Sequence, residues 1–232
     1  MSGTARPDEI RKFDALAARW WDPRGPMAPL HAMNPLRCGW IAERLAPGGD
    51  LSGLRILDVG CGAGLAAEAL ARRGAEVTAI DASVEALAVA RQHAEGSGLP
   101  IDYRCAPPEA LEGEWDAVVS LEVVEHVDHR PDFLRALAAR TRPGGAVFLS
   151  TLNRTPRSFV MAKLGAEYVF RLLARGTHDW RKFVSPAELG AELRQVGLRV
   201  TDIAGMSFSP IERRWKATRD VGINYILMAR RD

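Results

Sequence analysis

The chain has 232 residues, 47% of them hydrophobic and 26% charged, which argues against a disordered, collagen-like or disulfide-rich protein. This length suits one α/β domain with an extra element or two and is too short for two full enzyme domains. The 31 Lys and Arg residues nearly balance the 29 Asp and Glu residues, and a net charge of +2 argues against a dedicated nucleic-acid binder. Three widely spaced cysteines without a C-x-x-C motif indicate neither a disulfide framework nor a structural zinc site, and they favour a reducing compartment.

The first part of the chain is predicted to form a helical cap, residues 1–50, ahead of a main domain, residues 51–232. Apolar residues recur at helical spacing from Asp8 to Trp20 and again from Asn34 to Leu45, and the Pro/Gly-rich stretch WDPRGPMAP interrupts them. Trp20 and Trp21 are expected to pack this cap, or to face an aromatic substrate.

From Leu54 onward, short β-branched runs alternate with helical stretches, which is typical of βαβ units and a parallel sheet. Helices are predicted at Leu65–Arg73, Val84–Glu95, Pro131–Arg140 and Ser185–Val196, the last opened by an N-cap Ser, a Pro and a capping-box Glu. Strands are predicted at Arg55–Val59, Glu76–Ile80, Ile101–Cys105, Asp116–Leu121, Ala146–Thr151, Leu198–Ile203 and Asn224–Ala229.

The segment RILDVGCGAG is a predicted buried strand that runs into a glycine loop, Gly60 to Gly64, and then into a helix. Glycines permit a tight turn and allow backbone N–H groups to approach a ligand at a helix N-terminus. Asp81 follows the next strand, 21 residues after Gly60, where a carboxylate accepts hydrogen bonds from ribose hydroxyls. The pattern therefore predicts nucleoside binding. Leu65 stands where a dinucleotide fingerprint has its third glycine, which disfavours an NAD-dependent oxidoreductase.

The glycine loop resembles the first motif of class I S-adenosylmethionine (SAM) methyltransferases, D-V-G-C-G-x-G. The segments WDAVVSLEVVEHV and RPGGAVFLST resemble their fourth-strand motif and their entry into strand five. More specifically, RWWDPRGPMAPLHAMNPLR, LEVVEHV, STLNRT and GTHDWRKFVSPAEL resemble the ubiquinone-biosynthesis O-methyltransferases, from about Phe13 to Met228. These enzymes methylate a polyprenylated catechol-type intermediate and a later demethylubiquinol.

The resemblance implies a Rossmann-like α/β fold, with a seven-stranded, mostly parallel sheet whose last strand is antiparallel and with helices on both faces. It also implies SAM contacts at Arg37 in NPLR, at Gly60 in the glycine loop together with Gly62, at Asp81, and at Leu121 after strand four. Leu121 departs from relatives that carry Met there, but its similar volume should preserve a packing contact with the adenine.

Glu122, Glu125 and His126 follow strand four, and the carboxyl ends of strands face the ligand crevice in open α/β sheets. Two carboxylates and an imidazole could bind a divalent ion such as Mg²⁺, which would leave open positions for a catechol. Members of the family are described as Mg²⁺-dependent through the matching E-x-x-E-H. His126 could instead, or additionally, act as the general base. Alternatively, the two acids are helix-start residues favoured by the helix dipole and His126 merely packs nearby.

The other histidines carry less information. His31 and His178 lie in family-like segments and could line the substrate pocket, whereas His93 and His129 are interpreted as ordinary helix-surface or loop residues. None of these four histidines is assigned a catalytic role.

An amphipathic insertion is predicted at about residues 154–182. Its polar stripe consists of Lys163, Glu167, Arg171 and Arg175, and it has a wider apolar face than a short surface helix needs. Ser150 to Lys182 contains seven basic and two acidic residues. We expect either a lid helix or, for residues 158–175, association with a membrane surface. No secretory signal or spanning segment is evident, so a cytoplasmic protein, peripheral on the inner face of the membrane, is expected.

The sequence thus predicts O-methylation of a phenolic hydroxyl of polyprenylated ubiquinone precursors by SAM. The expected partners are a polyprenylated phenol or quinol substrate and a ubiquinone-biosynthesis complex. Two alternatives stay open: SAM-dependent methylation of another small phenolic substrate, and a non-catalytic SAM-binding, membrane-associated subunit. Retention of Gly60, Asp81, Glu125 and His126 argues against the second alternative.

Overall fold

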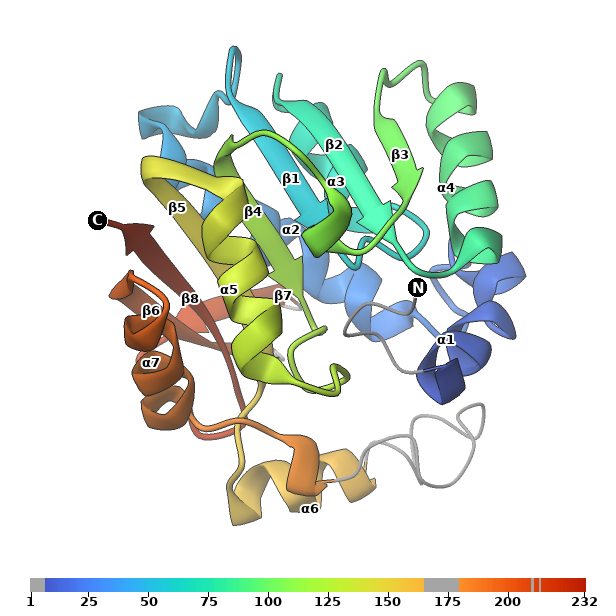
Figure 1. The fold of residues 1–232 in the computed structure, drawn as a ribbon. Coiled ribbons are helices and arrows are strands. Elements are labelled where there is room, and N and C mark those ends of the chain that lie inside the picture. Colours follow the sequence, from blue (N-terminus) through green and yellow to red (C-terminus); the bar gives the residue numbers. More distant parts are fainter. Residues whose placement is uncertain (1–6, 165–179, 210, 213) are drawn as a thin grey trace.

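The computed structural model describes residues 7–164, 180–209, 211–212 and 214–232. Its described strands form one sheet in the order β3-β2-β1-β4-β5-β8-β6-β7 (Figure 1). The strands are β1 (Arg55–Val59), β2 (Glu76–Asp81), β3 (Asp102–Cys105), β4 (Trp115–Leu121), β5 (Thr141–Leu152), β6 (Leu198–Ser209), β7 (Arg214–Thr218) and β8 (Asn224–Arg231).

Neighbouring strands from β3 to β5 are parallel, whereas β8 runs antiparallel to both β5 and β6. The pairing of β4 with β5 places Leu121 opposite Ser150, so that the residue after β4 lies beside the end of β5. Parallel strands end at the same edge of the sheet, and this edge collects the residues that follow β1, β2 and β4.

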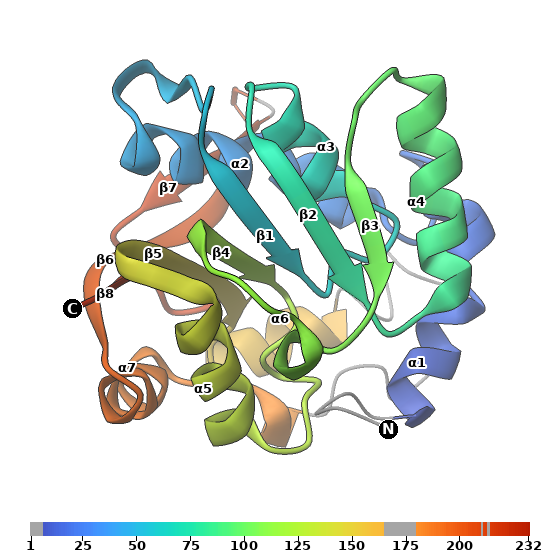
Figure 2. The same ribbon diagram turned by 45° about the horizontal axis from the view of Figure 1, so that its top comes forward.

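Helices cover both faces of the sheet (Figure 1, Figure 2). In chain order they are α1 (Pro7–Asp14), η1 (Ala17–Arg19), α2 (Ala28–Leu45), η2 (Pro47–Gly49), α3 (Leu65–Ala71), α4 (Val84–Gly96), η3 (Pro108–Ala110), α5 (Arg130–Arg140), α6 (Pro156–Leu164), η5 (Trp180–Lys182) and α7 (Pro186–Gln195). Side chains from α2, α3 and α4 pack on one face, and side chains from α5 and α7 pack on the other.

Successive residues of the central strands point alternately into these two cores. In β4, Ala117 and Val119 belong to the core under α2 to α4, and Val118 belongs to the core under α5 and α7. This alternation follows from the twofold side-chain repeat of a strand, and both faces are apolar because helices cover both. The predicted α/β fold with helices on both faces is thereby confirmed.

The predicted strand count is wrong by one, because the sheet of the described residues has eight strands. The additional strand is β7, which forms a hairpin with the second half of β6 and pairs Thr218 with Gly205. The prediction that the last strand is antiparallel is confirmed for β8.

The N-terminal helices also differ from the predicted bounds. The first helix ends at Asp14, and the 3-10 turn η1 follows it. The helix α2 begins at Ala28 rather than near Asn34, with Pro29 in its first turn and Pro35 inside it. A proline in the first turn costs no hydrogen bond, which permits this earlier start.

The predicted insertion lies largely outside the described residues. Within it, α6 and η5 are described, and the predicted stripe residues Glu167, Arg171 and Arg175 are not. Within the described parts of the chain, no helix combines the length and the apolar composition that are needed to cross a membrane.

Candidate active site

The glycine loop turns sharply between β1 and α3. Gly60 and Gly62 have φ angles of +73° and +52°, a conformation that L side chains rarely adopt. A Cβ at Gly60 would lie 2.5 Å from Cγ2 of Val123, and a Cβ at Gly62 would overlap the indole ring of Trp20. The loop therefore needs glycine for its backbone angles and also because neighbouring side chains press against it.

Asp81, at the end of β2, accepts one backbone hydrogen bond from this loop and one from Ser83. Its Oδ2 accepts from the N–H of Gly62 at 2.8 Å, and its Oδ1 accepts from the N–H of Ser83 at 2.8 Å. The hydroxyl of Ser83 is 2.5 Å from Oδ1 of Asp14 in α1. Burial raises the pKa of the Asp81 carboxyl, against the lowering effect of its backbone hydrogen bonds. The structure thus places Asp81 beside the glycine loop, as predicted.

A small cavity of about 50 Å³ opens beside the loop, at the carboxyl end of β1. It brings together three of the predicted cofactor residues, Arg37, Gly60 and Leu121, although they come from a helix, a loop and a different strand. Its lining consists of Trp20, Leu30, Asn34, Arg37, Asp58, Gly60, Cys61, Leu65, Ala66 and Leu121. Gly62 and Asp81 are not part of the lining and join the site through the hydrogen bond between them.

Asp58 is a functional candidate that the sequence reasoning missed. It lies in β1 at 2% exposure, and burial raises the pKa of its carboxyl to about 7, with Asp81 contributing in the same direction. Its Oδ2 and the Nε of Arg37 are buried, and neither has a hydrogen-bond partner among the described residues. A carboxylate and a guanidinium on one cavity suit a zwitterionic amino-acid group, so the residues present fit the methionine end of SAM. The sequence signal was available, since Asp58 is the acidic residue of D-V-G-C-G-A-G.

The N-terminal helices cover the loop and the cavity. Trp20 lies against Gly62, and its carbonyl oxygen is 2.8 Å from Nε2 of His31. The side-chain amide of Asn34 donates to the carbonyl of Leu65 at 2.7 Å. The cap therefore contacts the middle of the glycine loop through Trp20 and the residue after the loop through Asn34.

The predicted reaction residues form a turn that precedes α5. Glu122 has a φ of +58°, the single non-glycine positive φ in the described chain. Its N–H donates to the carbonyl of Ser150 at 3.0 Å, and its Oε1 accepts from the Ser150 hydroxyl at 2.6 Å. Nη1 of Arg37 lies 3.4 Å from the same Oε1. These contacts hold Glu122 in a strained backbone conformation, which is a common feature of functional sites.

Glu125 and His126 complete the turn. Glu125 is buried at 7% exposure, and the backbone N–H of His126 donates to the carbonyl of Val123 at 2.8 Å. The His126 ring meets the Phe13 ring edge to face, with centroids 5.6 Å apart. Because α5 begins only at Arg130, the interpretation of these acids as helix-start residues is wrong.

Comparison with known proteins decides the family. A methyltransferase-domain family model matches residues 30–203. The ubiquinone biosynthesis O-methyltransferase of Bordetella bronchiseptica is 48% identical over 227 residues, covering 96% of this chain and 93% of that protein. The chain belongs to the ubiquinone biosynthesis O-methyltransferase family. The enzyme of the same name from Pseudomonas aeruginosa is 47% identical over 228 residues and covers 97% of both chains. This O-methyltransferase is thus a SAM-dependent methyltransferase.

Solved structures support the fold of this O-methyltransferase. Magnesium protoporphyrin IX methyltransferase from Synechocystis PCC 6803, with bound SAH, has a TM-score of 0.67 at 22% identity and covers 95% of this chain and 94% of its own. A SAM-dependent methyltransferase from Aquifex aeolicus has a TM-score of 0.64 at 16% identity and covers 98% and 99% of the two chains. At such identities the likeness concerns the fold alone.

The metal set predicted for this O-methyltransferase is not assembled. The described residues contain no group of three or more His, Cys, Asp or Glu side chains placed to hold a metal ion. Oε1 of Glu122 is instead engaged by Ser150 and Arg37. Glu122, Glu125 and His126 therefore do not fit a three-ligand metal site in this conformation.

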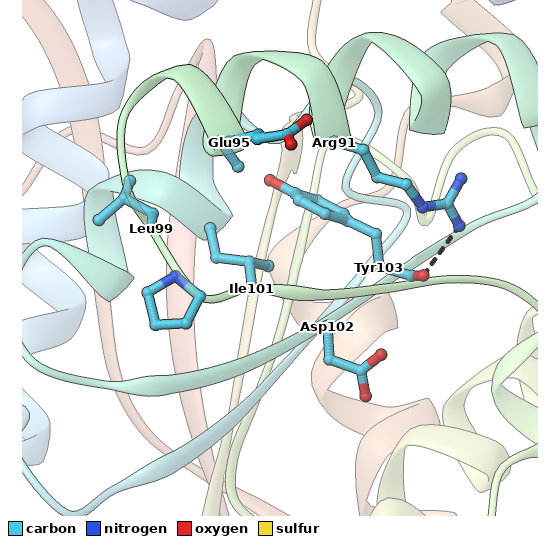
Figure 3. Close-up of a pocket in the computed structure, with 8 residues that line it drawn as sticks. Arg91, Glu95, Leu99, Ile101, Asp102 and Tyr103 are labelled. Atoms are coloured by element: carbon cyan, nitrogen blue, oxygen red, sulfur yellow. Dashed lines mark hydrogen bonds between the residues drawn. The ribbon is translucent and has the colours of Figure 1, made fainter.

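A second pocket lies away from these residues (Figure 3). It opens between the second half of α4 and the start of β3, where Arg91 donates to the carbonyl of Tyr103 at 2.9 Å. The start of β3 is at the opposite sheet edge from the glycine loop, because the loop follows the end of a parallel strand. This pocket shares no lining residue with the cavity beside the glycine loop, although a Cβ at Gly64 would overlap the Tyr103 hydroxyl.

Of the remaining histidines, His129 is exposed as expected and its ring pairs with Asp132 at 2.8 Å. His178 lies outside the described residues. His93 is not an ordinary surface residue, because it contacts a buried carboxylate and the cap.

Proposed function

We propose that this chain transfers a methyl group from SAM to a phenolic hydroxyl of polyprenylated catechol-type ubiquinone precursors, namely 2-polyprenyl-6-hydroxyphenol and 3-demethylubiquinol. The observation that carries the proposal is the likeness, over nearly the whole chain, to proteins named ubiquinone biosynthesis O-methyltransferase. The Arg37–Glu122 contact supports it, since this contact joins the cofactor cavity to the turn that holds His126.

The proposed cofactor contacts divide into two groups. Arg37 and the buried Asp58 would hold the amino-acid end of SAM, where each has a buried polar atom without a partner in the described chain. Gly60, Gly62 and Asp81 would hold the ribose, and Leu121 would pack against the adenine. SAM supplies an electrophilic methyl group on its sulfonium, so the protein mainly has to position the acceptor oxygen and remove its proton.

His126 is the proposed general base. An unperturbed phenol has a pKa of about 10, so that few acceptor molecules are ionised at neutral pH. Imidazole has an ordinary pKa of about 6.5 and can accept the phenolic proton in this range. Edge-on packing against Phe13 fixes the position of the His126 ring.

A requirement for Mg²⁺ is a separate proposal, with Glu122, Glu125 and His126 as the candidate ligands. Binding at this set would require Glu122 to release Ser150 and Arg37. Methyl transfer measured with Mg²⁺ and with chelator tests it. Equal rates under both conditions would refute the requirement and leave the His126 proposal untouched.

Association with the inner face of a membrane is also proposed. On α6, Phe159 and Val160 are 45% and 51% exposed, and the exposed Arg154 and Arg157 lie beside them in the sequence. An apolar surface bordered by basic residues suits an anionic lipid surface that contains a polyprenyl substrate. Association with other ubiquinone-biosynthesis proteins would follow from the same location.

Co-sedimentation with anionic vesicles tests the membrane proposal. Phe159→Ser with Val160→Ser should reduce binding, whereas Val84→Ser on α4, which changes a side chain that is 59% exposed, should not. Equal binding by the double variant and by wild type would contradict it.

The main test is methyl transfer from labelled SAM to a short-chain polyprenyl catechol. His126→Ala should lower kcat by about 10²-fold to 10⁴-fold and leave the KM for SAM nearly unchanged. His129→Ala serves as the control because His129 is exposed and lies outside the turn. If wild type binds SAM but forms no product, the substrate assignment is wrong. If His126→Ala retains full activity, His126 is not the base.

A further inference from the structure

His93 takes part in a set of contacts that the function proposed above does not use. Its Nδ1 is 2.6 Å from Oε1 of Glu68, a side chain on α3 that is 2% exposed. Oε2 of Glu68 accepts from Arg72 at 2.8 Å. Both oxygens of a buried carboxylate are thus engaged, which fixes the position of the His93 ring.

The His93 ring also contacts the N-terminal cap. The rings of His93 and Trp21 are stacked, with centroids 3.4 Å apart and planes 4° from parallel. The indole N–H of Trp21 donates to the carbonyl of Ala63, in the glycine loop, at 2.9 Å. The glycine loop and α4 therefore both contact Trp21, and α3 is linked to it through His93.

Trp20, the residue before Trp21, lines the cavity. Its ring lies against Gly62, and because Trp21 is adjacent in the chain, the contacts that hold Trp21 also restrain the backbone of Trp20. The cavity volume of about 50 Å³ admits one or two water molecules. Small-molecule sites typically measure about 300–1,000 Å³. The cavity in this conformation is too small for an adenosine cofactor, so side chains that line it, such as Trp20, have to move when one binds.

We propose that His93 is a positioning residue for cofactor exchange: oriented by Glu68, its ring holds Trp21 on the Ala63 carbonyl and thereby keeps Trp20 over the glycine loop. In this arrangement the stack is the contact that must loosen when SAM enters and when S-adenosylhomocysteine leaves. The inference needs the cofactor assignment and is independent of the phenolic substrate.

The proposal makes a kinetic prediction. Weakening the stack increases the fraction of molecules with an open cap, so the cofactor enters faster and leaves faster. The free energy of an aromatic stack corresponds to about a threefold to tenfold change in each rate constant. The equilibrium affinity changes less than either rate, because the two effects partly cancel.

The variant His93→Gln tests this prediction. Glutamine keeps a donor for Glu68 but has no ring to stack on Trp21. Stopped-flow fluorescence with S-adenosylhomocysteine should show that association and dissociation are both faster than in wild type. The matched control is His129→Gln, because the His129 ring pairs with Asp132 away from the cap.

A second variant separates positioning from folding. Trp21→Leu removes the stack from the cap side and leaves the Glu68–His93 pair in place, so it should accelerate both rates similarly. The double variant should add little beyond either single change, since both remove one contact. Amide hydrogen exchange of residues 14–27 should rise in both variants, while exchange in β1 stays unchanged.

Unchanged rate constants in both variants would overturn the proposal. Slower association together with a lowered melting temperature would also overturn it, because a merely structural role for His93 predicts that result. Binding of S-adenosylhomocysteine requires no phenol, so a failure here is distinguishable from a failure of the substrate assignment.

Discussion

Substitution of Gly62 by alanine tests the contact between the cap and the cofactor loop. Gly62 has a φ of +52°, and a Cβ at this position would overlap the Trp20 ring. The change therefore has two separate costs, one from the backbone conformation and one from the collision.

The magnitudes can be estimated separately. A left-handed backbone costs an alanine roughly 1–2 kcal/mol. Overpacking a buried contact costs about 1–3 kcal/mol more. Gly62→Ala should therefore lower the free energy of unfolding by about 2–5 kcal/mol. Gly98 provides the matched control: its φ is +66°, and no heavy atom lies within 4 Å of a Cβ built there. Gly98→Ala should cost only the backbone contribution, about 1–2 kcal/mol.

Chemical denaturation followed by circular dichroism measures both free energies. Trp20→Leu should offset part of the loss in Gly62→Ala and none of the loss in Gly98→Ala, which a double-mutant cycle expresses as a coupling energy. Equal destabilisation by the two alanines, with no coupling to position 20, would show that Trp20 does not lie on the loop in solution.

Three further outcomes are expected. The pKa of Asp58 in the folded protein is about 7, above the ordinary value of 3.8, so the folded state binds more protons and wild type should lose stability as the pH rises through this window. Asp58→Asn should not show this loss of stability in pH-dependent denaturation. The same pH dependence of the free energy of unfolding in the variant and in wild type would contradict the raised pKa of Asp58. Ser150→Ala removes a hydrogen bond to the Glu122 carboxylate and should lower stability by about 1.5–3 kcal/mol, whereas no measurable loss in thermal melts would refute that contact. Arg37→Lys loses the planar guanidinium and should weaken SAM binding about tenfold, or 1.4 kcal/mol, by calorimetry; unchanged affinity would exclude Arg37 from the cofactor site.

The sequence pattern predicted the central strands at or near their observed bounds. The run RILDV contains Ile56, Leu57 and Val59 and is followed by the glycine loop, and β1 occupies the predicted residues Arg55–Val59. The segment RWKAT alternates polar and apolar residues, as a half-exposed strand does, but no strand was predicted there; β7 occupies it and pairs with the end of β6. The signal for β7 was therefore present in the sequence, whereas its pairing with β6 follows from the tertiary fold.

The same distinction applies to the site. The glycine loop and Asp81 were recognisable because their spacing along one βαβ unit fixes their positions. The contact of Arg37 with Glu122 joins residues 85 positions apart. Stacking of Trp21 on His93 depends on how the cap folds over α4, and in the sequence His93 has the features of a surface residue. Side-chain partners across elements follow from packing, which a single sequence does not display.

The cap connects the two ends of the candidate active site through one ring. Phe13 lies 6.0 Å from Trp20, between ring centroids, and 5.6 Å from His126. Trp20 lines the cofactor cavity, and His126 is the proposed base. Because packed side chains leave little free volume, Trp20 cannot leave the loop without changing the packing of Phe13. In the proposed exchange step, movement of Trp20 would therefore also change the surroundings of His126, which links the geometry of the reaction end to the position of the cap.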